Sequence, residues 1–547
     1  MEGASRDRAA DLATLRSVQD AAKRGELGIA ADLAENALAD GLEHPLLYNV
    51  AAVQHERSGR AVEAEKLLRR AVAIDPTDIG SRNALGLCLL QLERPGEALT
   101  VFQALLEINP ELSYAHASLG NAFLALGGIT DAEASFVRSL ELDPNQGVAL
   151  TGLARIAAGR GTYPEARMYA LKALKAIPQY PPAVMSLAAA DLGERQASRA
   201  EARIRDLLDD PRIQPLERAL ANGQLGDTLD AQDRPDEAYA AYTECNETLR
   251  LLYAHQYANQ YNALDYVHAL ERFFGSPEST AWRERPAVGK QRTGAAGHVF
   301  LLGFPRSGTT LIEVILEGHP DVVSLEENES LIRSVQQYMQ RPEDIRRLAV
   351  APPAELEALR ASYWELVAAQ GVEVVDKTFV DKHPLNTLKL PLIARLFPDA
   401  KIVFACRDPR DIVLSCFRHR FRMSAPIYEL LSIEGAARYY DAVMQLLIRF
   451  MSVLPLDTCL VRHEDLVTEF AREMKRVCTF LGLNWDAGMG DFALRVKHRG
   501  VLTPSTAQLV RGLSTEGLGH WRRYRTHLAP VLEILEPWVS RFYYDPD

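Results

Sequence analysis

Small and hydrophobic residues recur at a fixed spacing through the first half of the chain. Four prolines that close helical patterns stand 34 residues apart, and in each unit a small residue lies 24 positions before the proline and an alanine 12 positions before it. Two helices whose backbones cross closely need small side chains at the crossing, with larger apolar side chains at helical spacing around them. The pattern therefore predicts a series of stacked helical hairpins. The closing prolines are Pro76, Pro110, Pro144 and Pro178.

This repeat resembles the tetratricopeptide family, whose period is 34 residues. The resemblance is strong over residues 45–178 and continues in a weaker form, so we expect an all-α solenoid over residues 10–273. It implies a concave surface that binds a peptide or a partner protein, while a self-packing scaffold without a ligand stays open as the alternative. Residues 274–297 combine Gly, Pro, Ser and charged residues, which is typical of a linker.

The hydrophobic pattern changes after this segment. An apolar run at 298–304 is followed by a turn and then by apolar residues at helical spacing, which predicts a strand, a turn and a helix. Further strands are expected near 372–376 and at 401–406. Strands that alternate with helices favour a parallel sheet with helices on both faces. The predicted fold is therefore an N-terminal α-solenoid followed by a P-loop-like α/β domain over residues 298–547.

Composition and charge narrow the classes of function. The chain has 547 residues, more than one core accommodates, and its 47% hydrophobic and 24% charged residues are typical of a globular protein. A net charge of -12 argues against nucleic-acid binding, which needs a basic surface. The sequence has neither a secretory signal pattern nor a run of about 18 apolar residues, so we expect a cytoplasmic protein without a membrane span. The six cysteines include no CxxC pair, and no metal site is expected.

The turn after the first predicted strand, residues 305–310, is suited to binding an anion. A strand-turn-helix junction directs several backbone N–H groups at one point, where a phosphate or sulfate can bind. The spacing of Gly303 and Gly308 imitates the nucleoside-triphosphate P-loop, but Thr309 stands where that loop has its lysine. A P-loop kinase is therefore the less favoured alternative. The residues that we expect to bind the anion are Arg306, Ser307, Gly308, Thr309 and Thr310.

Two segments resemble the sulfotransferase family. The sequence P-R-S-G-T-T-L resembles its 5'-phosphosulfate loop, and A-K-I-V-F-A-C-R-D-P-R-D-I-V-L-S resembles its 3'-phosphate segment. In that family an arginine at the strand end and a serine eight residues later bind the 3'-phosphate, and these match Arg407 and Ser415. The resemblance implies 3'-phosphoadenosine 5'-phosphosulfate (PAPS) as the sulfuryl donor and no metal. The R-D-P-R-D sequence alone fits a surface ion-pair cap equally well, but its pairing with the first segment favours the sulfotransferase.

Further motifs follow in the order of the protein-tyrosine sulfotransferases, over residues 298–525. They are H-P-D-V-V-S-L-E-E-N-E-S-L, D-K-H-P-L-N and P-S-T-A-Q-L. The resemblance implies that Glu327 is the general base that takes the acceptor proton. It also implies that Arg306 and Lys382 stabilise the charge on the leaving phosphate, and that Ser505 lies near the transferred group. Together the two halves resemble the bacterial-type tetratricopeptide-repeat sulfotransferases.

Several positions leave alternatives open. His383 stands directly beside the matched lysine and could be the base, as in the cytosolic sulfotransferases. His463 occupies the position of a nucleotide-contacting tyrosine in the protein-tyrosine relatives. Glu329 replaces an arginine that helps to receive acidic peptides, so the acceptor could be a protein or peptide tyrosine, a sugar or a small alcohol. A non-catalytic tetratricopeptide adaptor is less favoured, because the residues matched to the family's functions are retained.

Overall fold

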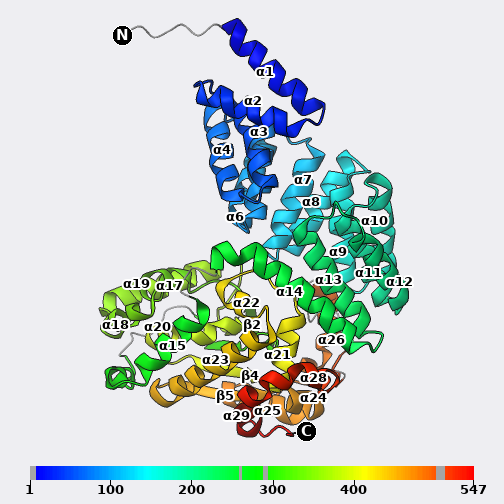
Figure 1. Ribbon diagram of the computed structural model, residues 1–547. Coiled ribbons are helices and arrows are strands. Elements are labelled where there is room, and N and C mark those ends of the chain that lie inside the picture. The colour runs from blue at the N-terminus through cyan, green and yellow to red at the C-terminus, as the bar shows by residue number, and fades with distance from the viewer. Residues whose placement is uncertain (1–7, 258–261, 287–293, 500–511, 516, 547) are drawn as a thin grey trace. The chain divides into compact units, whose positions relative to one another are not determined.

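The computed structural model describes residues 8–257, 262–286, 294–499, 512–515 and 517–546. Backbone contacts divide the described chain into two compact units, one that ends at Glu194 and one that begins at Arg195. Figure 1 labels the helices and strands of both units. Within the described residues, no helix is both long enough and apolar enough to cross a membrane.

The first unit consists of consecutive helical hairpins. Helices α4, α6, α8 and α10 each end two residues before one of the prolines that set the 34-residue period. The helices of this unit are α1 (Arg8–Lys23), α2 (Leu27–Ala39), α3 (Pro45–Arg57), α4 (Ala61–Ile74), α5 (Ile79–Gln91), α6 (Pro95–Ile108), α7 (Ser113–Ala125), α8 (Ile129–Leu142), α9 (Gly147–Gly159), α10 (Tyr163–Ala176) and α11 (Pro181–Gly193).

The small residues of the repeat lie where aromatic rings fill the hairpin crossings. A Cβ atom added to Gly86 would lie 2.5 Å from the ring of Phe102, and one added to Gly120 would lie 2.5 Å from the ring of Phe136. Both rings are fully buried. A larger residue at either glycine would displace a ring from a close-packed interior. The predicted stack of helical hairpins is confirmed.

The second unit begins with helices of the same kind. They are α12 (Ala197–Leu208), α13 (Pro215–Asp230), α14 (Pro235–Tyr257) and α15 (Ala263–Phe274). A 3-10 helix, η1 (Pro277–Trp282), follows within the segment predicted as a linker. Trp282 is buried there, because the guanidinium group of Arg395 lies 4.6 Å from its ring centroid and donates a hydrogen bond to the carbonyl of Ala281 (2.8 Å). The first part of the predicted linker thus packs within the second unit.

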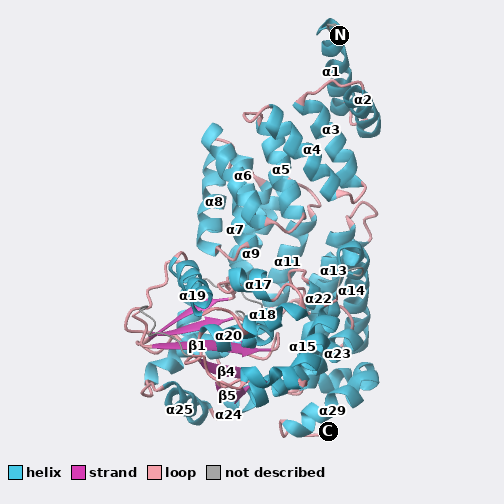
Figure 2. Ribbon diagram, turned by 90° about the vertical axis from the view of Figure 1, so that its left-hand side faces the viewer, coloured by secondary structure: helices cyan, strands magenta, loops and turns pink. Residues whose placement is uncertain are grey.

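The described strands form a five-stranded parallel sheet in the order β2-β3-β1-β4-β5 (Figure 2). Two of them match the strands predicted at 298–304 and 401–406. The prediction of a strand near 372–376 is wrong, because Val375 is half exposed and the fully buried run lies a few residues later. The strands are β1 (Gly297–Gly303), β2 (Val322–Glu326), β3 (Thr378–Lys382), β4 (Lys401–Cys406) and β5 (Asp457–Arg462).

Helices and short 3-10 helices connect these strands and follow the last of them. They are α16 (Thr309–Leu316), α17 (Ile332–Tyr338), η2 (Pro342–Asp344), α18 (Ile345–Ala349), α19 (Pro353–Ala368), η3 (Pro384–Lys389), α20 (Leu390–Leu396), α21 (Pro409–Arg418), α22 (Ala425–Glu429), α23 (Ile433–Val453), α24 (His463–Thr468), α25 (Phe470–Leu481), η4 (Ala487–Asp491), α26 (Phe492–Arg499), η5 (His520–Tyr524), α28 (Arg525–Leu528), η6 (Ala529–Val531) and α29 (Leu532–Arg541).

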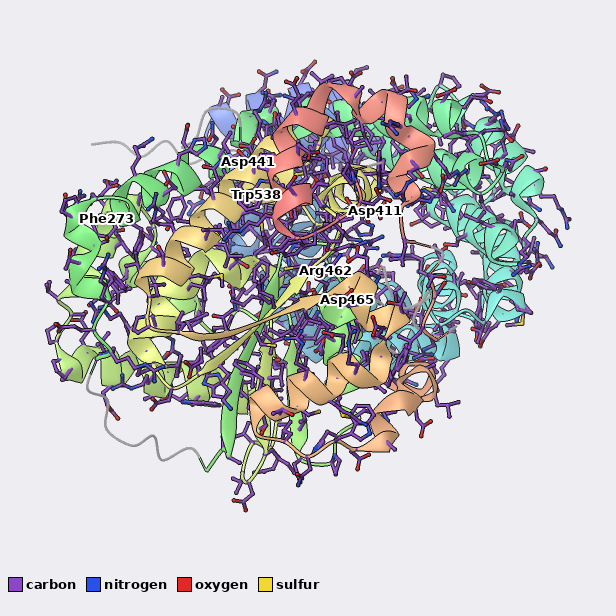
Figure 3. The ribbon with its side chains drawn as sticks, turned by 90° about the horizontal axis from the view of Figure 1, so that it is seen from below. Phe273, Asp411, Asp441, Arg462, Asp465 and Trp538 are labelled. Atoms are coloured by element: carbon purple, nitrogen blue, oxygen red, sulfur yellow. The ribbon has the colours of Figure 1, made fainter. Side chains whose placement is uncertain are left out.

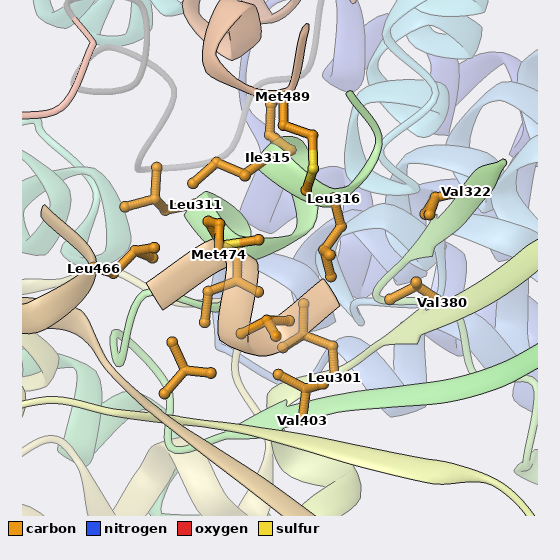
Figure 4. Packing of buried hydrophobic residues seen from close by; sticks show 14 of the residues in the cluster. Leu301, Leu311, Ile315, Leu316, Val322, Val380, Val403, Leu466, Met474 and Met489 are labelled. Carbon is orange, nitrogen blue, oxygen red and sulfur yellow. The ribbon is translucent and has the colours of Figure 1, made fainter. Parts of the chain in front are cut away.

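The sheet is covered on both faces, as predicted. On one face, Leu301 of β1 belongs to a buried cluster with Ile315 of α16 and Met474 of α25 (Figure 4). Side chains alternate between the faces of a strand, so the neighbouring Phe300 points the other way. There its ring packs against Tyr363 of α19, with centroids 6.1 Å apart. This packing leaves the carboxyl ends of β1, β3 and β4 at one edge, where ligands bind in open parallel sheets.

Candidate functional site

The loop between β1 and α16 has the backbone of an anion-binding turn. Gly308, the N-cap of α16, has a φ of 99°, and Arg306 has a φ of 71°. A left-handed conformation is costly for a residue with a side chain, and such outliers cluster at functional sites. A Cβ atom on Gly308 would also lie 2.7 Å from Nδ1 of His463, so glycine is required on steric as well as conformational grounds. The first N–H groups of α16 begin at this turn, at Thr309 and Thr310.

Ser307, in the same turn, is buried and points its hydroxyl inward. Among the residues that the structure describes, this hydroxyl has no hydrogen-bond partner. A buried polar group that lacks a partner costs free energy unless a ligand or water satisfies it. The turn therefore carries a donor that an anionic oxygen could satisfy.

The second anion-binding segment meets the first. Nε of Arg306 donates a hydrogen bond to Oγ of Ser415 in α21 (3.2 Å), and Nη1 of Arg407 donates to the carbonyl of Arg306 (3.4 Å). Within the described residues, Nε of Arg407 is buried without a partner. Strands β1 and β4 are neighbours in the sheet, so the segments that follow them start from the same edge. The structure thus brings together residues that lie about a hundred positions apart in sequence.

His463 starts α24 after the edge strand β5 and lies against the turn at Gly308. Burial, reinforced by the positive charges of Arg407 and Arg306, lowers the pKa of His463 to about 3. The imidazole is therefore neutral at physiological pH and can offer one donor and one acceptor. Its Nδ1 is buried and has no partner within the described part of the chain.

A segment near the C-terminus completes this side of the site. Nη2 of Arg407 donates to the carbonyl of Gly517 (2.6 Å), and Asp411 of α21 accepts hydrogen bonds from the backbone N–H groups of Gly519 and Trp521 (2.8 Å each). Asp411 is labelled in Figure 3. Sequence reasoning did not predict this segment. Its signal is the pair of glycines before a tryptophan, in G-L-G-H-W, but only the structure shows that these residues reach the arginine after β4.

Lys382 stands at the end of β3 and is fully buried. Its Nζ donates to Glu327 Oε1 (2.8 Å) and Glu326 Oε1 (2.9 Å), and lies 3.4 Å from Glu313 Oε2. Burial disfavours the charged ammonium, but the acidic groups around it, Glu313, Glu326 and Glu327, outweigh burial and raise the pKa of Lys382. The parallel register sets Glu326 directly beside Lys382. The lysine therefore stays charged and is held by acidic groups from three elements.

Glu327 follows β2 with a φ of 43°, and its N–H donates to the carbonyl of Lys382 (2.7 Å). Its side chain is 52% exposed, whereas that of Glu326 is 21% exposed. Burial of the carboxyl opposes ionisation, but the charge of Lys382 and its hydrogen bond hold the pKa of Glu327 below its ordinary value. An ionised carboxylate that is both anchored and exposed can accept a proton from a group in solvent.

Glu313, on α16, was missed by the sequence reasoning. Oγ of Ser324 lies 2.8 Å from Glu313 Oε1 and 2.6 Å from Glu317 Oε1. A serine hydroxyl carries one proton, so both contacts are hydrogen bonds only when one carboxyl group is protonated. Burial raises the pKa of the fully buried Glu313 to about 8, against the attraction of Lys382. We therefore assign the proton to Glu313.

His383 is turned away from this cluster toward Glu329. Its Nε2 lies 3.3 Å from Glu329 Oε1, and Nζ of Lys389 donates to Glu329 Oε2 (2.7 Å). The hydrogen bond from His383, aided by Lys389 and opposed by burial, lowers the pKa of Glu329 to about 2. Nε2 therefore faces Glu329, and the other ring nitrogen, Nδ1, is buried without a hydrogen-bond partner among the described residues. Ser505 lies outside the described residues.

Residues 298–487 match the model of the sulfotransferase family. The α/β part of this chain is thus similar to the sulfotransferase family. Models of the tetratricopeptide repeat match residues 57–122, and also residues 15–79 and 118–181, in agreement with the predicted repeat.

The chain also has relatives of modest identity. It is 26% identical to protein-tyrosine sulfotransferase 1 of Danio rerio over 261 residues, which cover 45% of this chain and 72% of the relative. An uncharacterized protein of Aquifex aeolicus is 25% identical over 345 residues, and the match spans 60% of this chain but only 43% of that protein's length. A solved tetratricopeptide repeat protein from Parabacteroides merdae aligns with 44% of this chain and 93% of its own, with 20% identity and a TM-score of 0.35.

Proposed function

We propose that this sulfotransferase moves a sulfuryl group from PAPS to a hydroxyl acceptor. The observation that carries the proposal is the meeting of two anion-binding segments, through the hydrogen bond from Arg306 to Ser415. A nucleotide with phosphate groups at both its 5' and 3' positions needs two such segments within one site. A nucleoside triphosphate presents its phosphates in one chain and needs only the first.

The residues present fit this donor. Arg306, Ser307, Gly308, Thr309 and Thr310 would hold the 5'-phosphosulfate, Arg407 and Ser415 would hold the 3'-phosphate, and His463 would contact the nucleotide beside the turn at Gly308. The buried hydroxyl of Ser307 and the buried Nε of Arg407 have no partner among the described residues, and both are donors. Burial lowers the pKa of Arg306 from its ordinary value, so an incoming anion would favour its charged form.

The chemistry proposed for the chain separates two tasks. Glu327 takes the proton of the acceptor hydroxyl as the new oxygen–sulfur bond forms and the bond from sulfur to the phosphate oxygen breaks. Arg306 and Lys382 stabilise the negative charge that develops on the departing phosphate. Ser505 is proposed to hydrogen-bond the transferred group. Glu327 rather than His383 is proposed as the base, because its carboxylate is ionised and exposed, whereas the remaining ring nitrogen of His383, Nδ1, is buried.

We propose a tyrosine of a protein or peptide held by the repeats as the acceptor, because several of the relatives are protein-tyrosine sulfotransferases. Glu329 would disfavour the acidic sequence around such a tyrosine, since like charges repel. Its contacts with Lys389 and His383 offset only part of this charge, because the Glu329 side chain is 52% exposed. An acceptor with neutral or basic neighbours is therefore preferred.

A thermal-shift titration tests the donor assignment. Adenosine 3',5'-bisphosphate should raise the melting temperature of the full-length protein, because a ligand that binds only the folded state stabilises it by mass action. ATP with magnesium, and NAD, serve as controls and should have little effect. A shift with ATP and magnesium but none with the bisphosphate would overturn the proposal in favour of a P-loop kinase.

A further inference from the structure

Asp230, the last residue of α13, joins the helical part of the second unit to its transferase part. Its carboxylate is mostly buried and accepts hydrogen bonds from Arg418 Nη2 (2.6 Å) and the hydroxyl of Tyr524 (2.7 Å). It also lies 3.0 Å from Arg523 Nη1 and 3.3 Å from His520 Nε2. Four donors from two separate segments therefore converge on one carboxylate.

The first of these segments leads directly to the proposed 3'-phosphate site. Arg418 is the last residue of α21, and Ser415 lies three residues before it on the same helix. The guanidinium group of Arg418 is buried, and carboxylates and aromatic hydroxyls around it outweigh burial and raise the pKa of this side chain. Its hydrogen bond to Asp230 fixes the end of the helix that presents Ser415.

The second segment leads to the same place from the other side. His520 and Tyr524 bound η5, which follows the glycines that meet the arginine after β4. Gly517 accepts the hydrogen bond of Arg407, and Gly519 donates to Asp411. Asp230 thus holds both the helix that carries Ser415 and the segment that orients Arg407.

Asp227 provides an internal comparison one helical turn earlier on α13. It pairs with Arg420 (2.5 Å) and accepts a hydrogen bond from Tyr242 of α14 (3.0 Å). Gly223 permits this contact, because a Cβ atom there would lie 2.6 Å from the Arg420 side chain. Asp227 therefore fastens the same hairpin to the loop after α21, through Arg420.

We propose that Asp230 is a positioning residue for the nucleotide site, which acts by holding Ser415 and Arg407 in the geometry that receives the 3'-phosphate. This inference rests on the proposed function. It implies that helix α13, which follows the helical hairpins in sequence, contributes to nucleotide binding by the transferase.

The test compares two ligands on full-length variants. Dissociation constants for adenosine 3',5'-bisphosphate and for 5'-AMP, which lacks the 3'-phosphate, would be measured by calorimetry for the wild type, Asp230→Asn, Asp227→Asn and Asp233→Asn. Asp233 is an exposed control, and it pairs with Arg523 (2.8 Å). We expect Asp230→Asn to weaken bisphosphate binding by about tenfold, as for a lost charge-assisted contact. The dissociation constant for 5'-AMP should stay nearly unchanged. The two control variants should change bisphosphate binding by less than about twofold.

Three outcomes would overturn the inference. They are unchanged bisphosphate binding in folded Asp230→Asn, an equal loss for both ligands, or an equal effect in Asp227→Asn. If Asp230→Asn does not fold, Tyr524→Phe takes its place, because it removes only one hydroxyl donor. This variant should weaken bisphosphate binding by a few-fold and leave 5'-AMP binding unchanged. The absence of this selective loss would also overturn the inference. A wild type that does not bind the bisphosphate would instead contradict the proposed function itself.

Discussion

The two sides of the site treat positive charge differently. On the side of the β1 turn, Arg306 donates to a serine hydroxyl and Arg407 donates to carbonyl oxygens, and Nη2 of Arg407 lies 4.0 Å from Asp411 Oδ2. On the β3 side, Lys382 donates to two carboxylates, at 2.8 and 2.9 Å. Burial lowers the pKa of Arg306, whereas the carboxylates raise the pKa of Lys382 despite its burial. The ammonium group of Lys382 is therefore paired more closely with acidic groups than the guanidinium group of Arg407 is.

This difference has a chemical consequence. On the turn side, burial disfavours the charged form of Arg306, and an anionic donor bound there would favour that form. On the β3 side, Lys382 holds the carboxylate of Glu327 at an exposed position, where it can act on the acceptor. Substitutions on the two sides should separate binding of the donor from turnover.

The largest effect is expected from Glu327→Gln. This change keeps the shape of the side chain and removes its basicity, so turnover should fall by about 10²–10⁴-fold, as for a lost general base. The dissociation constant of adenosine 3',5'-bisphosphate should stay nearly the same. Steady-state rates and calorimetry on the same preparations measure both quantities.

Glu326→Gln is the matched control, because Glu326 contacts the same ammonium group but is far less exposed. Its turnover should fall less than that of Glu327→Gln. His383→Asn should also be milder. If the His383 variant is inactive and folded while Glu327→Gln retains most activity, the base is His383.

Arg407→Ala and Ser415→Ala, on the side proposed to bind the donor, should weaken the binding of adenosine 3',5'-bisphosphate. Loss of a charge-assisted contact costs about 1.5–3 kcal/mol, so Arg407→Ala should show the larger effect. Titration calorimetry measures this directly, with 5'-AMP as the ligand that lacks the 3'-phosphate. Equal affinities of wild type and both variants for the bisphosphate would remove the 3'-phosphate assignment.

Glu313→Gln tests the buried proton on the β3 side through the pH dependence of stability. The folded state raises the pKa of Glu313 from about 4.5 to about 8, so the folded protein binds the proton more tightly than the unfolded chain. The contribution of this group to stability is therefore present below pH 4.5 and is lost as the pH rises toward 8.

The wild type should lose stability relative to Glu313→Gln across this range, by more than about 1.4 kcal/mol, the free energy of one pKa unit. Urea unfolding of both proteins between pH 5 and 8.5 measures the difference. A constant difference would show that Glu313 is ionised throughout. Unfolding is the suitable readout, because activity would also report the ionisation of Glu327.

The smallest effect is expected from Glu329→Gln, which removes a charge near the proposed acceptor position. Turnover with a neutral peptide should change by less than about threefold, and KM for a peptide with acidic residues beside its tyrosine should fall by a few-fold, because a repulsion is removed. Peptides that differ only in these flanking residues provide the comparison. The same KM ratio in wild type and variant would remove Glu329 from acceptor selection.

The sequence predicts the centre of the sheet better than its edges. Strands β1 and β4 are continuous buried runs, and their boundaries agree with the prediction. The two strands that were not predicted, β2 and β5, form the edges of the sheet, and their burial is mixed. An edge strand such as Asp457–Arg462 has no long apolar run, so hydrophobic periodicity does not reveal it.

The residues proposed to bind the donor could be predicted from the sequence for a related reason. Its residues lie in two contiguous motifs, each attached to a buried strand, so the motif and the strand are recognised together. The contact of Glu313 with Lys382 depends on the packing of α16 against β3, and that of Glu326 on the register between β2 and β3. The proposed role of Asp230 depends on contacts between residues that lie nearly 300 positions apart in the sequence. No local pattern encodes these long-range pairs.

The most direct test of the account uses PAPS labelled with ³⁵S and full-length protein, with a tyrosine peptide as the acceptor. The account predicts that labelled sulfate moves to the peptide and that one adenosine 3',5'-bisphosphate is released for each peptide modified. It further predicts that Glu327→Gln binds the bisphosphate like the wild type yet transfers almost no label. A wild type that does not bind the bisphosphate, or a Glu327→Gln variant that transfers label at the wild-type rate, would contradict it.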